Sequence, residues 1–118
     1  MKIRLSLTAS RDIPLLTLYH VPEFDFKGWI KNSLRAFAET DRAVKILLPD
    51  IPDNLKLKKV ILSITLDEQK DRAVIKWLET MKKEEWCPRI RCVLQYCLEE
   101  PCIFYCYKDP AAAIAKWR

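Results

Sequence analysis

The stretch Lys59-Val-Ile-Leu-Ser-Ile-Thr-Leu66 decides the fold of this chain, because an aliphatic residue occupies every second position in it. In an extended segment, successive side chains point to opposite faces. One face then consists of aliphatic side chains alone, and the other consists of Lys59, Ile61, Ser63 and Thr65. The stretch therefore predicts a strand that is buried on one face only.

A near copy of this stretch lies at the start of the chain, where residues 2–8 read Lys-Ile-Arg-Leu-Ser-Leu-Thr. When Ile3 is matched with Val60, the aliphatic positions of the two copies coincide. The polar positions of the first copy are Lys2, Arg4, Ser6 and Thr8. Among them only Arg4 aligns with an aliphatic residue, Ile61. We expect two similar strands, each with an aliphatic face and a face rich in Lys, Arg, Ser and Thr.

Two helical segments are expected after the first strand. An apolar pattern over residues 11–21 predicts a short helix capped by Ser10, although its Leu-Leu-Thr-Leu-Tyr core equally suits a strand. Asp25 is a suitable N-cap for a longer helix through Ala38, in which apolar residues recur at helical spacing.

The second half of the chain repeats this order. An apolar stripe from Val74 to Met81 predicts a helix with Asp67 as its cap. The charged run 82–85 predicts a turn. Pro88 suits the first turn of one more helix, because the N–H that proline lacks has no partner there.

Two further segments, residues 44–48 and 102–107, are typical of strands. The chain then divides into two units, residues 1–50 and 58–109, each with the order strand, helix, helix, strand. The last helices of the two units align best when Ile30 is matched with Ile90, which predicts a short insertion at the helical turn of the second unit. We therefore expect an α+β fold with an internal repeat in a single domain, residues 1–118.

The charge of the chain favours an anionic partner. The net charge is +5 and the isoelectric point is near 9.0, and nucleic acid is the commonest anionic partner of basic proteins. The chain contains one glycine, so the Gly-rich loops that bind nucleotide phosphates are excluded. No apolar run is long enough to cross a membrane, and the first ten residues do not resemble a signal peptide.

The cysteines predict a reducing compartment. There are five, an odd number, and all lie between Cys87 and Cys106. Their spacing does not match the paired ligands of structural zinc, so we expect no metal site and a cytoplasmic protein.

No catalytic set of residues emerges from the sequence. His20 is the only histidine, and a structural role is the more common one for a half-buried histidine beside a tyrosine. Asp50 and Asp53 lie in a proline-rich, linker-like run. We expect a protein without enzymatic activity and without a cofactor.

A strand followed by two helices resembles the ribbon-helix-helix fold of MetJ- and Arc-like regulators. In that family two strands pair antiparallel and enter the major groove of DNA. The resemblance implies a tandem ribbon-helix-helix with extra strands, and double-stranded DNA as its partner. The residues that it implies for reading bases are Lys2, Arg4, Ser6, Thr8, Lys59, Ser63 and Thr65. Ile61 would either contact a thymine methyl group or mark a strand face turned toward protein.

The same resemblance implies that the amino ends of the second helices hold DNA phosphates through free backbone N–H groups. In this chain the corresponding residues are Lys27, Gly28, Arg89 and Arg91. Pro88 removes one of the N–H donors in the second half.

Among ribbon-helix-helix proteins, the size and basic charge are similar to those of ParR-type plasmid partition adaptors. That resemblance implies self-association on a repeated DNA site and a C-terminal tail that engages an actin-like filament. Residues 110–118 would be this tail, with Ile114 and Trp117 as anchors. A transcriptional repressor is an equally good interpretation.

The main structural alternative is a ferredoxin-like α+β sandwich, which would be a protein-interaction or RNA-binding module. It predicts one sheet of four strands, at residues 1–9, 44–48, 58–66 and 102–107. The ribbon interpretation instead pairs residues 2–8 with residues 59–66 and leaves their polar face open.

Overall fold

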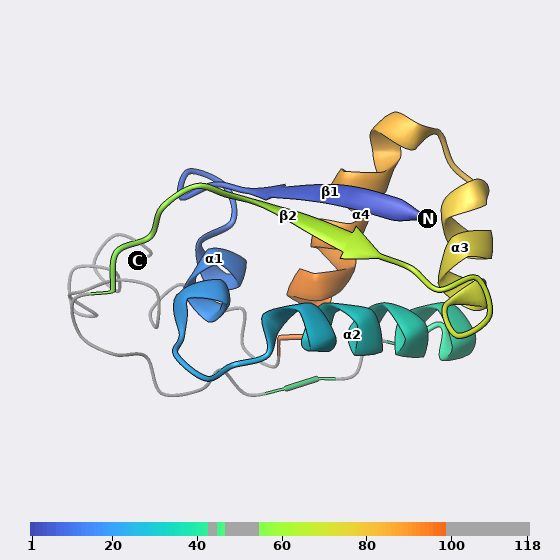
Figure 1. Cartoon of the computed structure of the whole chain (residues 1–118), viewed down its shortest axis with the longest axis horizontal. Coiled ribbons are helices and arrows are strands. Elements are labelled where there is room, and N and C mark those ends of the chain that lie inside the picture. Colours follow the sequence, from blue (N-terminus) through green and yellow to red (C-terminus); the bar gives the residue numbers. More distant parts are fainter. Residues whose placement is uncertain (43–44, 47–54, 99–118) are drawn as a thin grey trace, which may run out of the picture.

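Two strands and four helices make up the part of the chain that a computed structural model describes, which is residues 1–42, 45–46 and 55–98 (Figure 1). The elements in order are β1 (Lys2–Leu7), α1 (Ile13–His20), α2 (Phe26–Thr40), β2 (Val60–Thr65), α3 (Arg72–Glu79) and α4 (Lys83–Tyr96). The chain is therefore a small α+β fold. No helix within the described ranges is both long enough and apolar enough to cross a membrane.

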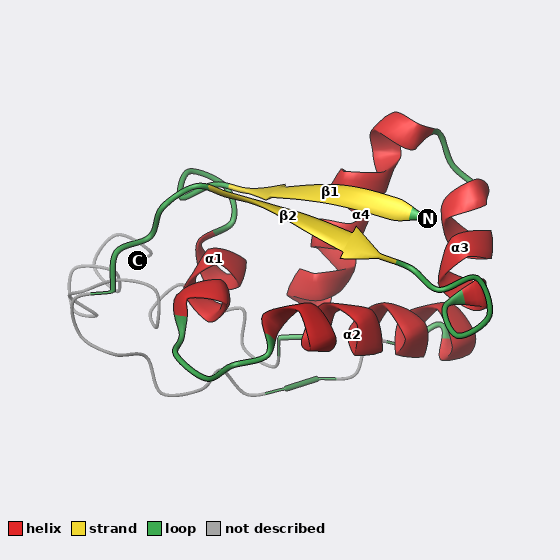
Figure 2. Ribbon diagram, viewed as in Figure 1, coloured by secondary structure: helices red, strands yellow, loops and turns green. Residues whose placement is uncertain are grey.

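β1 and β2 pair antiparallel, as the ribbon interpretation predicts. The register runs from Lys2 opposite Thr65 to Leu7 opposite Val60. Backbone hydrogen bonds between Met1 and Leu66, of 2.7 and 3.2 Å, extend the pairing by one position. We call this two-stranded sheet the ribbon; Figure 2 shows it in yellow among the red helices.

The helices cover the aliphatic face of the ribbon. In the view of Figure 1, α2 runs below the ribbon, α4 passes behind it, and α1 and α3 lie toward its two ends. Ile3, Leu5 and Leu7 of β1 belong to one buried cluster, together with apolar residues of β2 and of all four helices. An isolated pair of strands is marginally stable in water, so the ribbon depends on this burial.

The structure aligns the residues of the two halves differently from the alignment that the strand sequences favour. The sequence matches Ile3 with Val60, which we call the strand alignment. The helices instead match Ile13 with Arg72 at their starts and His20 with Glu79 at their ends, because α1 and α3 are equally long.

The turns before these helices agree with the helices. Asp12 Oδ2 accepts the N–H of Thr8 at 3.0 Å, and Asp71 Oδ2 accepts the N–H of Asp67 at 2.8 Å. We call the match of Asp12 with Asp71 the turn alignment. It shifts the strands by two positions relative to the strand alignment, so that Arg4 corresponds to Ser63.

Several helix ends differ from those that the sequence predicts. α1 begins after Asp12, not after Ser10. α3 begins after Asp71, because the side chain of Asp67 instead accepts the N–H groups of Gln69 and Lys70 within the preceding turn.

The last helix begins well before the proline that was expected in its first turn. α4 starts at Lys83, where Glu85 Oε2 accepts the backbone N–H of Lys82 at 3.3 Å and two glutamates lie in the first turn. Pro88 lies inside the helix, where it removes a single backbone donor. The connection between the helices is shorter in the second half, residues 80–82 against 21–25, so the predicted insertion is wrong.

The remaining predicted segments lie mostly outside the described residues. These are the strand 102–107, the linker-like run and the tail 110–118. Of the strand 44–48, the structure describes Lys45 and Ile46. Ile46 forms an isolated parallel bridge with Leu98 next to the carboxyl end of α4. This bridge does not belong to the ribbon.

Two arginines link one half of the fold to the other. Arg35 on α2 donates from Nε to Asp71 at the start of α3. Arg91 on α4 lies with Nε 3.8 Å from Oδ1 of Asp12 at the start of α1. Both carboxylates are buried. Thus α2 of the first half supplies a cation to the start of α3 in the second half, and α4 of the second half supplies one to the start of α1 in the first half.

Asp71 makes the stability of the fold dependent on pH. Burial alone would raise its pKa, but the hydrogen bonds from Arg35 and from the backbone of Asp67 outweigh burial and lower the pKa below its usual value. A carboxyl group whose folded-state pKa is lowered stabilises the fold above its unfolded-state pKa. This stabilisation is lost as the pH falls through the folded-state pKa.

We expect Asp71→Asn to lower the free energy of unfolding at pH 7 by roughly 1.5–3 kcal/mol, because a hydrogen bond to a charged group is lost. Urea unfolding at several pH values measures this difference, which should be full above about pH 5 and shrink below it. Glu68→Gln, an exposed carboxylate in the same turn, is the matched control. Equal effects of the two substitutions, or a difference that does not change with pH, would contradict this role of Asp71.

Candidate nucleic-acid interface

The face of the ribbon that points away from the helices carries six side chains, which we call the outward face. They are Lys2, Arg4 and Ser6 of β1 and Ile61, Ser63 and Thr65 of β2. Five of the six residues are exposed, and Ser6 is half-buried. The alternation predicted from the sequence is confirmed along both strands.

The outward face is arranged in three rows that cross the ribbon. Lys2 lies opposite Thr65 and Arg4 lies opposite Ser63. Ser6 lies opposite Ile61. Because directly opposed residues have Cβ atoms about 5 Å apart, each row presents two side chains to the same ligand group or to adjacent groups.

Thr8 and Lys59 lie just beyond the pair Leu7–Val60, at one end of the ribbon. Lys59 is exposed. Thr8 is half-buried, and its hydroxyl group is 3.2 Å from Oγ of Ser10, with which it shares a hydrogen bond. The side chain of Lys59 can therefore reach a ligand, whereas the hydroxyl group of Thr8 is engaged in a hydrogen bond within the turn after β1.

The ribbon and its approaches are free of acidic residues. Residues 1–11 and 55–66 contain six lysines and arginines and no Asp or Glu. All six cations are exposed: Lys2, Arg4, Arg11, Lys56, Lys58 and Lys59. Within the described ranges only Arg11 among them forms an ion pair, with Asp12. Apart from that of Arg11, the positive charges of this surface are therefore not neutralised by ion pairs with the described side chains.

The approach to β2 includes two lysines, Lys56 and Lys58, that the sequence reasoning did not select. The backbone of Lys58 is held by His20 at the end of α1, whose Nε2 lies 3.3 Å from both the N–H and the carbonyl oxygen of Lys58. The run Lys56-Leu-Lys-Lys59 was the available signal for this cluster. His20 has a structural contact here, since it holds this basic segment beside α1.

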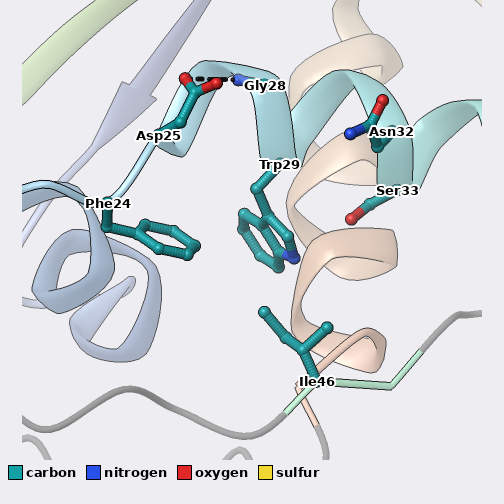
Figure 3. A pocket seen from close by; sticks show the side chains of 7 residues that line it. All are labelled: Phe24, Asp25, Gly28, Trp29, Asn32, Ser33 and Ile46. Atoms are coloured by element: carbon teal, nitrogen blue, oxygen red, sulfur yellow. Dashed lines mark hydrogen bonds between the residues drawn. The ribbon is translucent and has the colours of Figure 1, made fainter.

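The amino end of α2 is already capped by a carboxylate. The N–H of Gly28 donates to Oδ1 of Asp25 at 3.1 Å (Figure 3). A Cβ on Gly28 would collide with Oδ2 of Asp25, so glycine permits this close approach. The free N–H group that the resemblance implies at Gly28 is therefore engaged. The side chain of Lys27 is exposed beside it.

Arg89 and Arg91 do not lie at the amino end of α4. They lie in the middle of this helix, because it begins at Lys83. Arg89 is exposed, whereas the side chain of Arg91 is 14% exposed and lies against Asp12. The expected position of both residues at a helix end was wrong, and Arg91 links the two halves of the fold.

The second turn of α4 touches the edge of the ribbon. Cys87 Sγ donates to the carbonyl oxygen of Arg4 at 3.0 Å. The first turn just before it contains Glu84 and Glu85, which complement the positive end of the helix dipole. These carboxylates disfavour a phosphate at this helix end.

A pocket of about 450 Å³ lies at the start of α2, as Figure 3 shows. Phe24, Trp29 and Ile46 form much of its lining, with Asn32 and Ser33 on one side. Trp29 Nε1 is buried and has no hydrogen-bond partner among the described residues. None of the pocket residues belongs to the ribbon.

Comparison of the chain with protein-family models, curated proteins and solved structures gives no match. The geometry and charge of the ribbon are therefore the basis for a functional assignment. They bring together Lys2, Arg4, Ser6, Ser63 and Thr65 on one surface, with Lys59 at its end.

We expect Arg91→Ala to lower the free energy of unfolding by about 1–3 kcal/mol, because it removes a cation facing the buried Asp12, whose Oδ1 accepts no hydrogen bond in the described structure. Arg89→Ala, on the same helix, is the control, with an expected change within about 0.5 kcal/mol. Chemical denaturation at pH 7 measures both. If the two substitutions had the same effect, Arg91 would not link the halves as described.

Proposed function

We propose that this protein binds double-stranded DNA by placing the ribbon in the major groove, as a single-chain tandem ribbon-helix-helix protein. One observation above all supports this proposal. The two strands pair through their backbones and bury their aliphatic face, so that a basic, acid-free outward face is left uncovered by the described elements.

The dimensions of the ribbon suit the groove. Paired strands lie about 4.8 Å apart, and the major groove of B-DNA is about 12 Å wide and 8.5 Å deep. A two-stranded ribbon therefore enters with its side chains directed at base edges. In this orientation Arg4 and Ser63, the central row, approach the floor of the groove first.

The side chains of the outward face have the chemistry that base edges require. Arg4 and Lys2 donate hydrogen bonds, and guanine offers O6 and N7 as acceptors in the major groove. Ser63 and Thr65 both donate and accept, so they suit several bases.

The phosphate contacts in this proposal come mainly from lysines and less from helix ends. Lys56, Lys58 and Lys59 follow one another along the approach to β2 and are all exposed. Lys27 adds a cation beside the capped end of α2. Lysine side chains reach phosphates as point charges and need no free backbone N–H group.

Partition adaptor and repressor are the two biological roles that we propose for such a protein in the cytoplasm. Self-association on repeated DNA sites serves both roles. A partition adaptor would in addition engage an actin-like filament through residues 110–118, with Ile114 and Trp117 as anchors. This tail lies outside the described residues. Co-sedimentation of the DNA-bound protein with such filaments, with and without residues 110–118, distinguishes the two roles.

Arg4→Ala and Lys59→Ala are expected to weaken binding to a selected duplex in different ways. Arg4→Ala should cost about 1–3 kcal/mol and relax the preference at one base position. Lys59→Ala should weaken binding to all sequences alike and lower the slope of log K against log salt by about one. Titration of a labelled duplex at several salt concentrations measures both quantities.

Lys76→Ala is the matched control, because Lys76 is an exposed cation on α3 and does not belong to the ribbon. All three substituted residues are exposed, so the variants should unfold at the same urea concentration as the unaltered protein. Unchanged affinity in both ribbon variants, or an equal loss in the Lys76 variant, would refute the proposed interface.

A further inference from the structure

The two ends of the outward face carry different side-chain chemistry. This difference becomes clear when the residues of the two halves are matched by the turn alignment. Arg4 is then equivalent to Ser63, and Ser6 is equivalent to Thr65. Lys2 is equivalent to Ile61. A charged donor in one half thus corresponds to an aliphatic side chain in the other.

The row of Arg4 and Ser63 is the centre of this comparison, because each of these residues pairs with its own equivalent. The rows on either side are Lys2 with Thr65 and Ser6 with Ile61. In a ribbon of two identical strands these flanking rows would be the same pair. Here one row presents an ammonium group and a hydroxyl group, and the other presents a hydroxyl group and an aliphatic side chain.

The side chain of Ile61 is large and hydrophobic, yet it is exposed. It is 61% exposed, and within the described ranges it shares such exposure of a large hydrophobic side chain with Tyr96 alone. It lies among polar and basic neighbours on the outward face, so no apolar partner from the described elements covers it. An anionic partner would cover Ile61 if it presented an apolar group to the same face of the ribbon that its charged groups contact. The methyl group of thymine in the major groove of DNA is such a group.

We propose that the protein reads a non-palindromic duplex, with Lys2 and Arg4 on guanine and Ile61 on the methyl group of a thymine. This inference rests on the proposed function. The rows of Lys2 and Ile61 lie on either side of the central row, about 13 Å apart along the strands. The guanine that Lys2 contacts and the thymine that Ile61 contacts are then separated by roughly three to four base pairs.

Selection of duplexes from a random pool by the full chain tests the asymmetry. The expected result is a consensus without inverted symmetry that contains a thymine on one side of its centre. Replacement of that thymine by deoxyuridine, which lacks only the methyl group, should weaken binding about fourfold, the equivalent of one buried methylene group. In Ile61→Ala the same replacement should change affinity less than twofold.

Ile61→Lys is the matched variant for this test, because it gives the second half the residue that the first half has at Lys2. The two flanking rows then each contain a lysine and a hydroxyl side chain. Selection with this variant should replace the thymine on that side by guanine, so that both flanking rows select guanine. The central row stays unequal, because Arg4 still lies opposite Ser63. Since Ile61 is exposed, both substitutions should leave the urea midpoint unchanged, which checks that altered selection does not reflect unfolding.

The outcomes separate this inference from the proposed function. If no duplex is enriched and none binds, the proposed function fails and this inference fails with it. If the unaltered chain selects an inverted repeat, or binds thymine and deoxyuridine duplexes equally, DNA binding stands and the asymmetric reading is overturned. A deoxyuridine penalty that persists in Ile61→Ala would also overturn the assignment of the methyl contact to Ile61.

Discussion

Burial of the aliphatic face of the ribbon is the interaction on which the rest of this structure depends. Two strands cannot shield their own apolar side chains, and a two-stranded sheet alone is marginal in water. The strands come from opposite halves of the chain, and helices from both halves contribute to the cluster that covers them. Neither half can therefore bury its strand in this arrangement without the other. The same requirement leaves the opposite face of the ribbon uncovered, and this face is the candidate interface.

Charged groups add a second link between the halves, through two buried carboxylates at the starts of the first helices. Asp12 and Asp71 each accept a backbone N–H from the turn that precedes the helix, and each faces an arginine from the second helix of the opposite half. A buried carboxylate is costly without such partners. The turn, the helix start and the contact between halves are therefore stabilised together, and the lowered pKa of Asp71 reflects the same contacts.

The distribution of charge separates the proposed DNA surface from the rest of the molecule. Residues 1–11 and 55–66 have no carboxylate, whereas the first turn of α4 and the cap of α2 each have at least one. Caps of this kind satisfy helix N–H groups within the protein, so these ends have less to offer a phosphate. In the proposed complex, the cations of the ribbon and its approach therefore supply most of the electrostatic attraction. The shape of the ribbon supplies the access to base edges.

The sequence by itself determined which residues form the two strands, which side chains share each face, and therefore most of the candidate interface. It did not determine how the two halves correspond. Alternation has a period of two, so a shift by two positions leaves every side chain on the same face. The strand alignment and the turn alignment are for this reason equally good as strand patterns. The turns at Asp12 and Asp71 and the helices that follow them distinguish the two alignments, and they make Ile61 the counterpart of Lys2. The structural role of Arg91 also required the tertiary structure, because its partner Asp12 belongs to the opposite half of the chain and no local pattern connects them.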